Sequence, residues 1–216
     1  TTPATTQPRV DAAAARSRAQ GIVARMTLDE KIALVHSLFP PMAAGKTTNE
    51  LIPSAGHTDG IPRLGVPLVP ESDASLGVAN QVEQRKGDVA TALPSGLATA
   101  SSFDPEIARA GGAMIGSEAR SKRFNVLLAG GVNLTRDPWN GRNFEYLGED
   151  PLLAGELAGA HINGVQSNRI VSTIKHFALN SPETGRTVSD ARIGEQALRM
   201  SDLLAFELEI ERGHPG

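Results

Sequence analysis

Three clusters of polar side chains each follow a short apolar run, and their residue types suit a hydroxyl-rich ligand. Carboxylates accept hydrogen bonds from adjacent hydroxyls, whereas arginine, lysine and histidine donate to them with fixed geometry. A sugar is a ligand of this kind. The clusters are Glu71-Ser72-Asp73 after residues 66–69, residues 136–145 after 126–134, and Lys175-His176-Phe177 after 170–174.

Taken singly, these residues also have structural interpretations. Arg142 and Glu145 are spaced to form a surface ion pair, and Lys175 could cap a strand end. Trp139, the only tryptophan, could stack on a sugar face or pack against its own loop. Asn133 begins a glycosylation sequon, but its place among the polar clusters favours a buried structural role. The joint position of the clusters at three successive run ends favours a binding site.

Helix signals occur at regular places along the chain. Thr27-Leu28-Asp29-Glu30 has the form of a capping box, and two Asp-Pro pairs, at 104–105 and 150–151, combine an N-cap with a first-turn proline. We therefore expect helices over 11–20, about 28–37, from 104, from 150, and over 193–211 with Gly213 as the C-terminal cap. Residues 39–62, rich in Pro, Gly and Thr, are expected to form a long loop.

The apolar runs 66–69 and 126–134, with 170–174, alternate with these helices and predict strands. Nearly continuous apolar runs are typical of parallel strands covered on both faces. The fold class is therefore α/β, as a barrel or a doubly wound sheet. In an α/β barrel, function collects in the loops after the C-terminal ends of the strands, where the polar clusters lie.

Composition excludes several classes of function. Of 216 residues, 24 are acidic and 21 basic without clustering, which argues against nucleic acid as a partner. No apolar run approaches the ~20 residues that span a bilayer, so we expect no membrane segment. The five histidines lack metal-ligand spacing, no Gly-x-Gly-x-x-Gly or Walker loop supports a nucleotide-binding sheet, and we expect no cofactor or metal. The polar start at Thr1 is typical of a mature secreted or periplasmic chain.

Three ordered motifs resemble glycoside hydrolase family 3, the β-glucosidase and β-xylosidase family. They are Ile61-Pro62-Arg63-Leu64-Gly65-Val66-Pro67, Asn140-Gly141-Arg142-Asn143-Phe144-Glu145-Tyr146-Leu147-Gly148-Glu149-Asp150-Pro151-Leu152-Leu153, and Lys175-His176-Phe177-Ala178-Leu179-Asn180 followed by Glu183 and Arg186.

The resemblance implies the first part of a (β/α)8 TIM barrel over residues 25–216, after an N-terminal extension and leading helix over 1–24. It also implies a retaining β-glycosidase that hydrolyses terminal non-reducing β-linked sugars. Asp73 would accept hydroxyl hydrogen bonds from the innermost sugar of a β-glucoside or related oligosaccharide, and Arg142, Lys175 and His176 would donate them.

Two departures and one absence qualify this picture. Residues 74–79, Ala-Ser-Leu-Gly-Val-Ala, lack the arginine that is usual in the family, and Ala178-Leu179-Asn180-Ser181 differs from the Pro-Gly-His-Gly of bacterial N-acetylglucosaminidases. The family's nucleophile and acid/base are expected beyond Gly216, in the remainder of the same enzyme. Met200-Ser201-Asp202-Leu203 imitates the nucleophile motif, but Asp202 is predicted to be a solvated helix residue.

From these observations we expect residues 1–216 alone to bind sugar without hydrolysing it. The alternative to a piece of an active glycosidase is a non-catalytic carbohydrate-binding barrel fragment or pseudoenzyme. Such a protein would fold stably in isolation.

Overall fold

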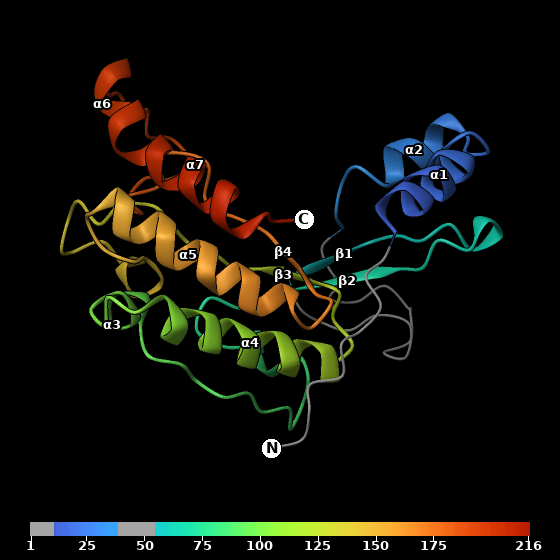
Figure 1. Cartoon of the computed structure of the whole chain (residues 1–216), viewed down its shortest axis with the longest axis horizontal. Coiled ribbons are helices and arrows are strands. Elements are labelled where there is room, and N and C mark those ends of the chain that lie inside the picture. Colours follow the sequence, from blue (N-terminus) through green and yellow to red (C-terminus); the bar gives the residue numbers. More distant parts are fainter. Residues whose placement is uncertain (1–10, 39–54) are drawn as a thin grey trace. The chain divides into compact units, whose positions relative to one another are not determined.

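The computed structural model describes residues 11–38 and 55–216, which form two compact units. The smaller unit comprises residues 11–38 and 58–68, and the larger comprises residues 55–57 and 69–216. The helices and strands are labelled in Figure 1.

In the smaller unit, side-chain caps set the starts of both helices. Asp11 accepts the backbone N–H groups of the first turn of α1 (Ala12–Val23). Thr27 and Glu30 form the predicted capping box of α2 (Leu28–Ala33), which ends earlier than expected. Arg63, in the 3-10 helix Pro62–Leu64, donates from Nε to Glu30 at 2.7 Å. The two caps satisfy first-turn N–H groups that every helix leaves unpaired.

The four strands form one sheet in the order β1 (Gly56–Thr58), β2 (Val69–Asp73), β3 (Val126–Leu128) and β4 (Val171–Ser172). Parallel register pairs Asp73 with Leu128 and Leu127 with Ser172. The predicted α/β class with parallel strands is confirmed, because each parallel neighbour is reached through a helical crossover. Within the expected loop 39–62, residues 39–54 lie outside the described part, and β1 was not expected.

The predicted first strand, residues 66–69, is wrong in its bounds. Val66 pairs instead with Ile61 in an isolated antiparallel bridge, and β2 begins at Val69. The strand therefore includes Glu71, Ser72 and Asp73, which the sequence placed in the following loop. Glu71 and Ser72 are buried although they are polar. The extended conformation of this strand is therefore fixed by pairing with the neighbouring strand and not by an apolar run.

The other two predicted strands are shorter than expected. β3 ends at Leu128, two residues before Gly130, whose φ of +83° interrupts the extended backbone. Beyond this point one parallel bridge, between Gly131 and Lys175, continues the pairing. The chain after β3 and the chain after β4 thus remain side by side where the polar clusters begin.

Helices α4 (Pro105–Ser121), α5 (Pro151–Gln166) and α7 (Asp202–Gly213) lie in a row beside the strands (Figure 1). Asp104 and Asp150 cap α4 and α5 as predicted, each with proline in the first turn. A Cβ atom built on Gly112 would collide with the backbone oxygen of His161 on α5. Glycine is therefore required for the close approach of these two helices.

The expected single helix over 193–211 is two helices. α6 (Glu195–Met200) and α7 meet at Ser201, whose φ of −123° and ψ of −93° are not helical. The predicted end is also off by one residue, since Gly213 closes α7 and His214 adopts the left-handed conformation after it.

The break corrects the prediction for Asp202, which is not solvated. Its side chain is completely buried and pairs with Arg136, the first residue of the second polar cluster. The Ser201 hydroxyl donates to the same carboxylate at 2.9 Å. Asp202 is buried because the helix restarts at this residue and turns it toward the loop after β3.

The core of the larger unit lies between the strands and the helix row. Its main cluster of buried side chains joins the sheet to α4 and α5 and contains Ile115, Ala119, Phe124, Leu127, Val165 and Ile170. A second cluster joins α5 to α7 through Ala158, Ala205 and Phe206. None of the helices in the described residues is long and apolar enough to cross a membrane.

Candidate functional site

The predicted binding residues lie at the carboxyl ends of three neighbouring strands. Asp73 is the last residue of β2, and Lys175 follows β4 and pairs through its backbone with Gly131, which follows β3. Arg142 belongs to the long loop between β3 and α5, and His176 follows Lys175. Because the parallel strands end at one edge of the sheet, the fold brings all four side chains into one network.

Asp73 and Lys175 form the first contact of this network. Lys175 Nζ donates to Asp73 Oδ1 at 3.0 Å across the ends of β2 and β4. The other carboxylate oxygen of Asp73 accepts from Gln81 Nε2 at 3.1 Å. Gln81 begins the 3-10 helix Gln81–Glu83, so the loop after β2 folds back over the carboxylate that ends the strand.

Glu145 is the centre of the network. It ends the 3-10 helix Asn143–Glu145 and is only 6% exposed. Arg142 Nε donates to Glu145 Oε1 at 2.5 Å, and the Ser75 hydroxyl donates to Oε2 at 2.9 Å. Lys175 Nζ lies 3.9 Å from Oε2. The Arg142–Glu145 pair therefore exists, but it is a buried pair and not the surface pair that the spacing alone allowed.

His176 contacts Arg142 from the next loop. Arg142 Nη2 lies 2.8 Å from His176 Nε2, and a guanidinium can only donate, so Nε2 must be the unprotonated acceptor. The proton of the neutral ring is then on Nδ1, which lies 3.3 Å from Asn133 Oδ1. Burial, together with the positive charges of Arg142 and Lys175, lowers the pKa of His176 to about 4.

Two buried residues fix the backbone and ring of His176. The Asn133 side-chain amide donates to the His176 carbonyl at 3.0 Å and its oxygen accepts the His176 N–H at 2.7 Å. Asn133 is thus buried, as expected for that sequon, and positions the loop after β4. Tyr146 meets the imidazole edge to face and donates to the Asn180 carbonyl at 3.1 Å. Burial raises the pKa of Tyr146 to about 12, so the phenol stays protonated.

Opposing effects act on the guanidinium of Arg142. Burial works to lower its pKa, but the hydrogen bond and charge of Glu145 outweigh it and raise the pKa above its usual value. Arg142 therefore stays charged at neutral pH. Its third nitrogen, Nη1, lies 3.8 Å from Glu183 Oε1.

A cavity of about 420 Å³ opens above the strand ends, within the usual range for small-molecule sites. Asp73, Arg142 and Lys175 line it together with Glu145. His176 is not among the lining residues, so it reaches this cavity only through Arg142. Trp139 is 91% exposed and does not pack against its own loop.

Sequence reasoning missed Glu145, Asn133 and Gln81 as members of the site. Glu145 lies in the longest motif, three residues after Arg142, so its place could have been found from the spacing. Asn133 lies in the segment after β3, and nothing in its local sequence indicates that its side chain holds His176. No sequence pattern marks Gln81 as a site residue, because its contact with Asp73 depends on how the loop after β2 folds back.

The arrangement presents hydrogen-bond donors and acceptors around one hollow. Lys175 and Arg142 supply charged donors, and Asp73 and Glu145 supply acceptors, each already held by a partner of opposite charge. Within residues 11–38 and 55–216, no cluster of three or more His, Asp or Glu side chains is placed to hold a metal ion. The chemistry of the hollow suits a neutral, polyhydroxylated molecule.

Comparison with known proteins identifies the family. The sequence model of the glycosyl hydrolase family 3 N terminal domain matches residues 20–215. The beta-glucosidase BoGH3A of Bacteroides ovatus is 39% identical over 203 residues, which are 91% of this chain and 25% of that protein. The thermostable beta-glucosidase B of Acetivibrio thermocellus is 35% identical over 200 residues, covering 90% of this chain and 24% of that one.

Solved structures agree. Beta-glucosidase 3B of Thermotoga neapolitana, in complex with glucose, superposes with a TM-score of 0.84 at 35% identity and covers 92% of this chain and 28% of its own. This likeness confirms the expected fold, the first part of a (β/α)8 barrel. The chain spans about a quarter of the length of the curated relatives that it matches. With its family model matched almost from end to end, the chain belongs to glycoside hydrolase family 3.

Proposed function

We propose that this chain forms the sugar-binding part of a retaining β-glycosidase that acts on terminal non-reducing β-linked sugars. The observation that carries the proposal is the cavity at the strand ends, which Asp73, Arg142 and Lys175 line together. In this proposal Lys175 and Arg142 donate to sugar hydroxyls and Asp73 accepts from them. His176 acts through Arg142, whose Nη2 it holds in place.

Glucose is the sugar that we propose. The relatives named above are beta-glucosidases, and the Thermotoga neapolitana structure is a complex with glucose. The pairing of the site residues supports a neutral ligand of this kind, because Lys175 is balanced by Asp73 and Arg142 by Glu145. A ligand that brings its own charge would leave one of these groups without a partner.

We place the chemical step outside residues 1–216. Retaining glycosidases use two carboxyl groups about 5 to 5.5 Å apart, one as nucleophile and one as acid/base. Asp73 and Glu145 are both held by cations, and Asp202 is buried against Arg136, so none of the three is proposed as the nucleophile. The nucleophile and acid/base would belong to the remainder of the same enzyme.

Glucose binding to the chain tests the first part of the proposal. Calorimetric titration should give measurable binding to the parent, and Lys175→Met should weaken it about tenfold or more, because a charge-assisted hydrogen bond is lost. The matched control is Arg192→Met, since Arg192 forms an exposed ion pair with Asp190 away from the cavity. Equal affinities of the parent and Lys175→Met would contradict the assignment.

Hydrolysis of an aryl β-glucoside tests the second part. Residues 1–216 should bind sugar and release no aryl alcohol, because no positioned nucleophile is available. Turnover comparable to that of an intact family member would place the catalytic carboxylates within this chain. Binding without turnover by the intact protein as well would favour a non-catalytic sugar-binding protein.

A further inference from the structure

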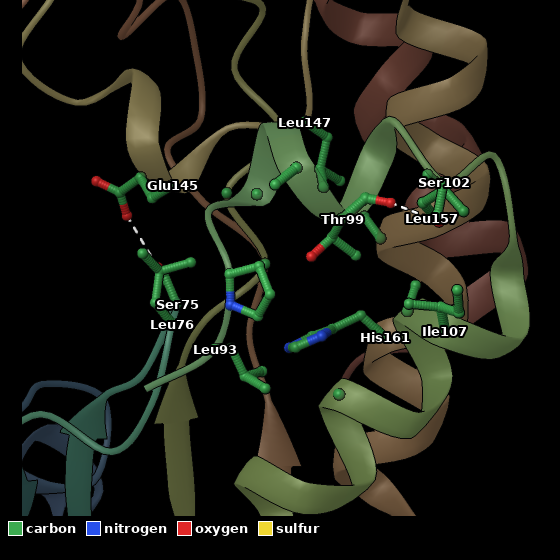
Figure 2. A pocket seen from close by; sticks show the side chains of 18 residues that line it. Ser75, Leu76, Leu93, Thr99, Ser102, Ile107, Glu145, Leu147, Leu157 and His161 are labelled. Carbon is green, nitrogen blue, oxygen red and sulfur yellow. Dashed lines mark hydrogen bonds between the residues drawn. The ribbon is translucent and has the colours of Figure 1, made fainter. Parts of the chain in front are cut away.

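A second cavity, of about 380 Å³, lies in the larger unit and adjoins the proposed sugar cavity. It is enclosed by α3 (Gly96–Ala100), α4, α5 and the loop that carries Leu93 (Figure 2). Ser75, Leu76 and Glu145 line both cavities. The Ser75–Glu145 hydrogen bond of 2.9 Å is therefore part of the partition between them.

The walls of this second cavity are mainly apolar. Leucine and isoleucine side chains from four segments face it, with small residues between them; the large ones are Leu76, Leu93, Ile107, Leu147 and Leu157. Ile107 is half exposed and Ser102 is exposed, so the cavity reaches solvent at the turn between α3 and α4. An apolar space of this size with an open rim suits a small apolar molecule.

One polar group interrupts the apolar wall and defines the ligand further. The imidazole of His161 projects from α5 into the cavity (Figure 2). Burial lowers the pKa of His161 to about 4, so the ring is neutral at pH 7. A neutral imidazole has one protonated and one unprotonated ring nitrogen, and the unprotonated nitrogen accepts hydrogen bonds. A ligand with a hydroxyl donor can satisfy that acceptor, whereas a hydrocarbon cannot.

We propose that this cavity is a second ligand site, separate from the sugar cavity, which binds a neutral phenol or similar aryl alcohol. The aromatic ring occupies the space between Leu93, Ile107 and Leu157, and the hydroxyl donates to His161. Because the site needs neither Arg142 nor Lys175, it does not depend on the sugar-binding function proposed above.

Phenol and toluene are matched probes, since they have nearly the same shape and differ in that a methyl group of toluene replaces the phenol hydroxyl. The parent chain should bind both and prefer phenol about fivefold, the effect of one net hydrogen bond. His161→Leu should keep toluene binding and lose the preference. A parent that binds neither probe, or that binds toluene as tightly as phenol, would overturn the proposal.

Filling the cavity gives a second test with its own control. The Cβ atom of Ala at position 111 would meet only the Leu93 Cδ1 atom, at 3.3 Å, so Gly111→Ala should fold and bind phenol like the parent. Gly111→Leu should reduce phenol binding at least tenfold, because its side chain enters the cavity. Retained phenol binding in a folded Gly111→Leu variant would contradict the site.

Nuclear Overhauser contacts in the parent make the test independent of any variant's folding. Phenol ring protons should contact the methyl groups of Ile107 and Leu157. Lys175→Met should leave these contacts and the phenol affinity unchanged, so a failure of sugar binding and a failure of this proposal are separately visible. Contacts confined to the sugar cavity would refute the second site.

Discussion

Removing the partner of Asp202 should destabilise the larger unit far more than removing a surface partner. Asp202 is completely buried and its ion pair with Arg136 joins the break before α7 to the loop after β3. Arg136→Leu leaves the carboxylate buried with only the Ser201 hydroxyl as a hydrogen-bond donor. We expect this variant to lose several kcal/mol of unfolding free energy.

The size of the loss follows from the exposure of the two partners. Breaking a buried ion pair costs about 3 to 5 kcal/mol, whereas an exposed pair contributes about 0 to 1 kcal/mol. Arg136 is 46% exposed and Asp202 is not exposed at all, so the cost should lie near the lower end, about 3 kcal/mol. With a urea dependence of about 2 kcal/mol per molar, the midpoint should fall by about 1.5 M.

Urea unfolding followed by circular dichroism measures this shift, and Arg192→Leu is the matched control. Arg192 pairs with Asp190 at 2.7 Å, but both side chains are largely exposed, so its midpoint should hardly change. Arg136→Leu combined with Asp202→Leu should recover part of the loss, because no buried charge remains. Equal midpoints for Arg136→Leu and Arg192→Leu would refute the argument from burial.

Two further predictions follow from the site and the helix packing. The folded-state pKa of His176, about 4, lies below its unfolded value of about 6.5. Between these pH values the unfolded chain binds more protons than the folded chain, so the free energy of unfolding falls as the pH falls. We expect a loss of about 1 to 2 kcal/mol over this window, allowing for solvent screening of a half-buried ring. His176→Gln should flatten this part of a pH series of urea midpoints, and an unchanged slope would contradict the assignment. Gly112→Ala should lower the melting temperature by about 6 °C, because its Cβ collides with the His161 backbone. Gly21→Ala, which meets nothing within 4 Å, should instead raise it slightly, and a melting temperature for Gly112→Ala at or above that of the parent would argue against the close helix contact.

Local chemistry made some of these elements predictable from the sequence. The Asp-Pro pairs at 104–105 and 150–151 and the capping box at Thr27 predict helix starts because each satisfies N–H groups that the first turn leaves unpaired. The order of strands and helices follows from apolar periodicity. Polar clusters after successive apolar runs predicted a binding site at the strand ends, and the family resemblance singled out Asp73, Arg142 and Lys175 within those clusters.

Tertiary contacts determined the parts that were mispredicted. β2 contains Glu71 and Ser72 as buried residues, and no apolar pattern marks them as strand. The break at Ser201 has no glycine or proline to announce it, and the burial of Asp202 depends on Arg136, 66 residues away. The spacing to Arg142 indicates one partner of Glu145, but its contacts with Ser75 and Lys175 come from two other loops and depend on the fold.

The paired state of the site before any ligand arrives bears on how a sugar would bind. Lys175 uses one of its three N–H donors on Asp73, at 3.0 Å, and Arg142 uses Nε on Glu145. Both side chains are held by these contacts in the wall of the cavity that they line. Ordering a long side chain on binding costs about 0.5 to 1.5 kcal/mol, and here folding has met that cost beforehand. In the proposed function the two carboxylates would therefore have two roles, as acceptors for sugar hydroxyls and as anchors for the cations that donate to the sugar.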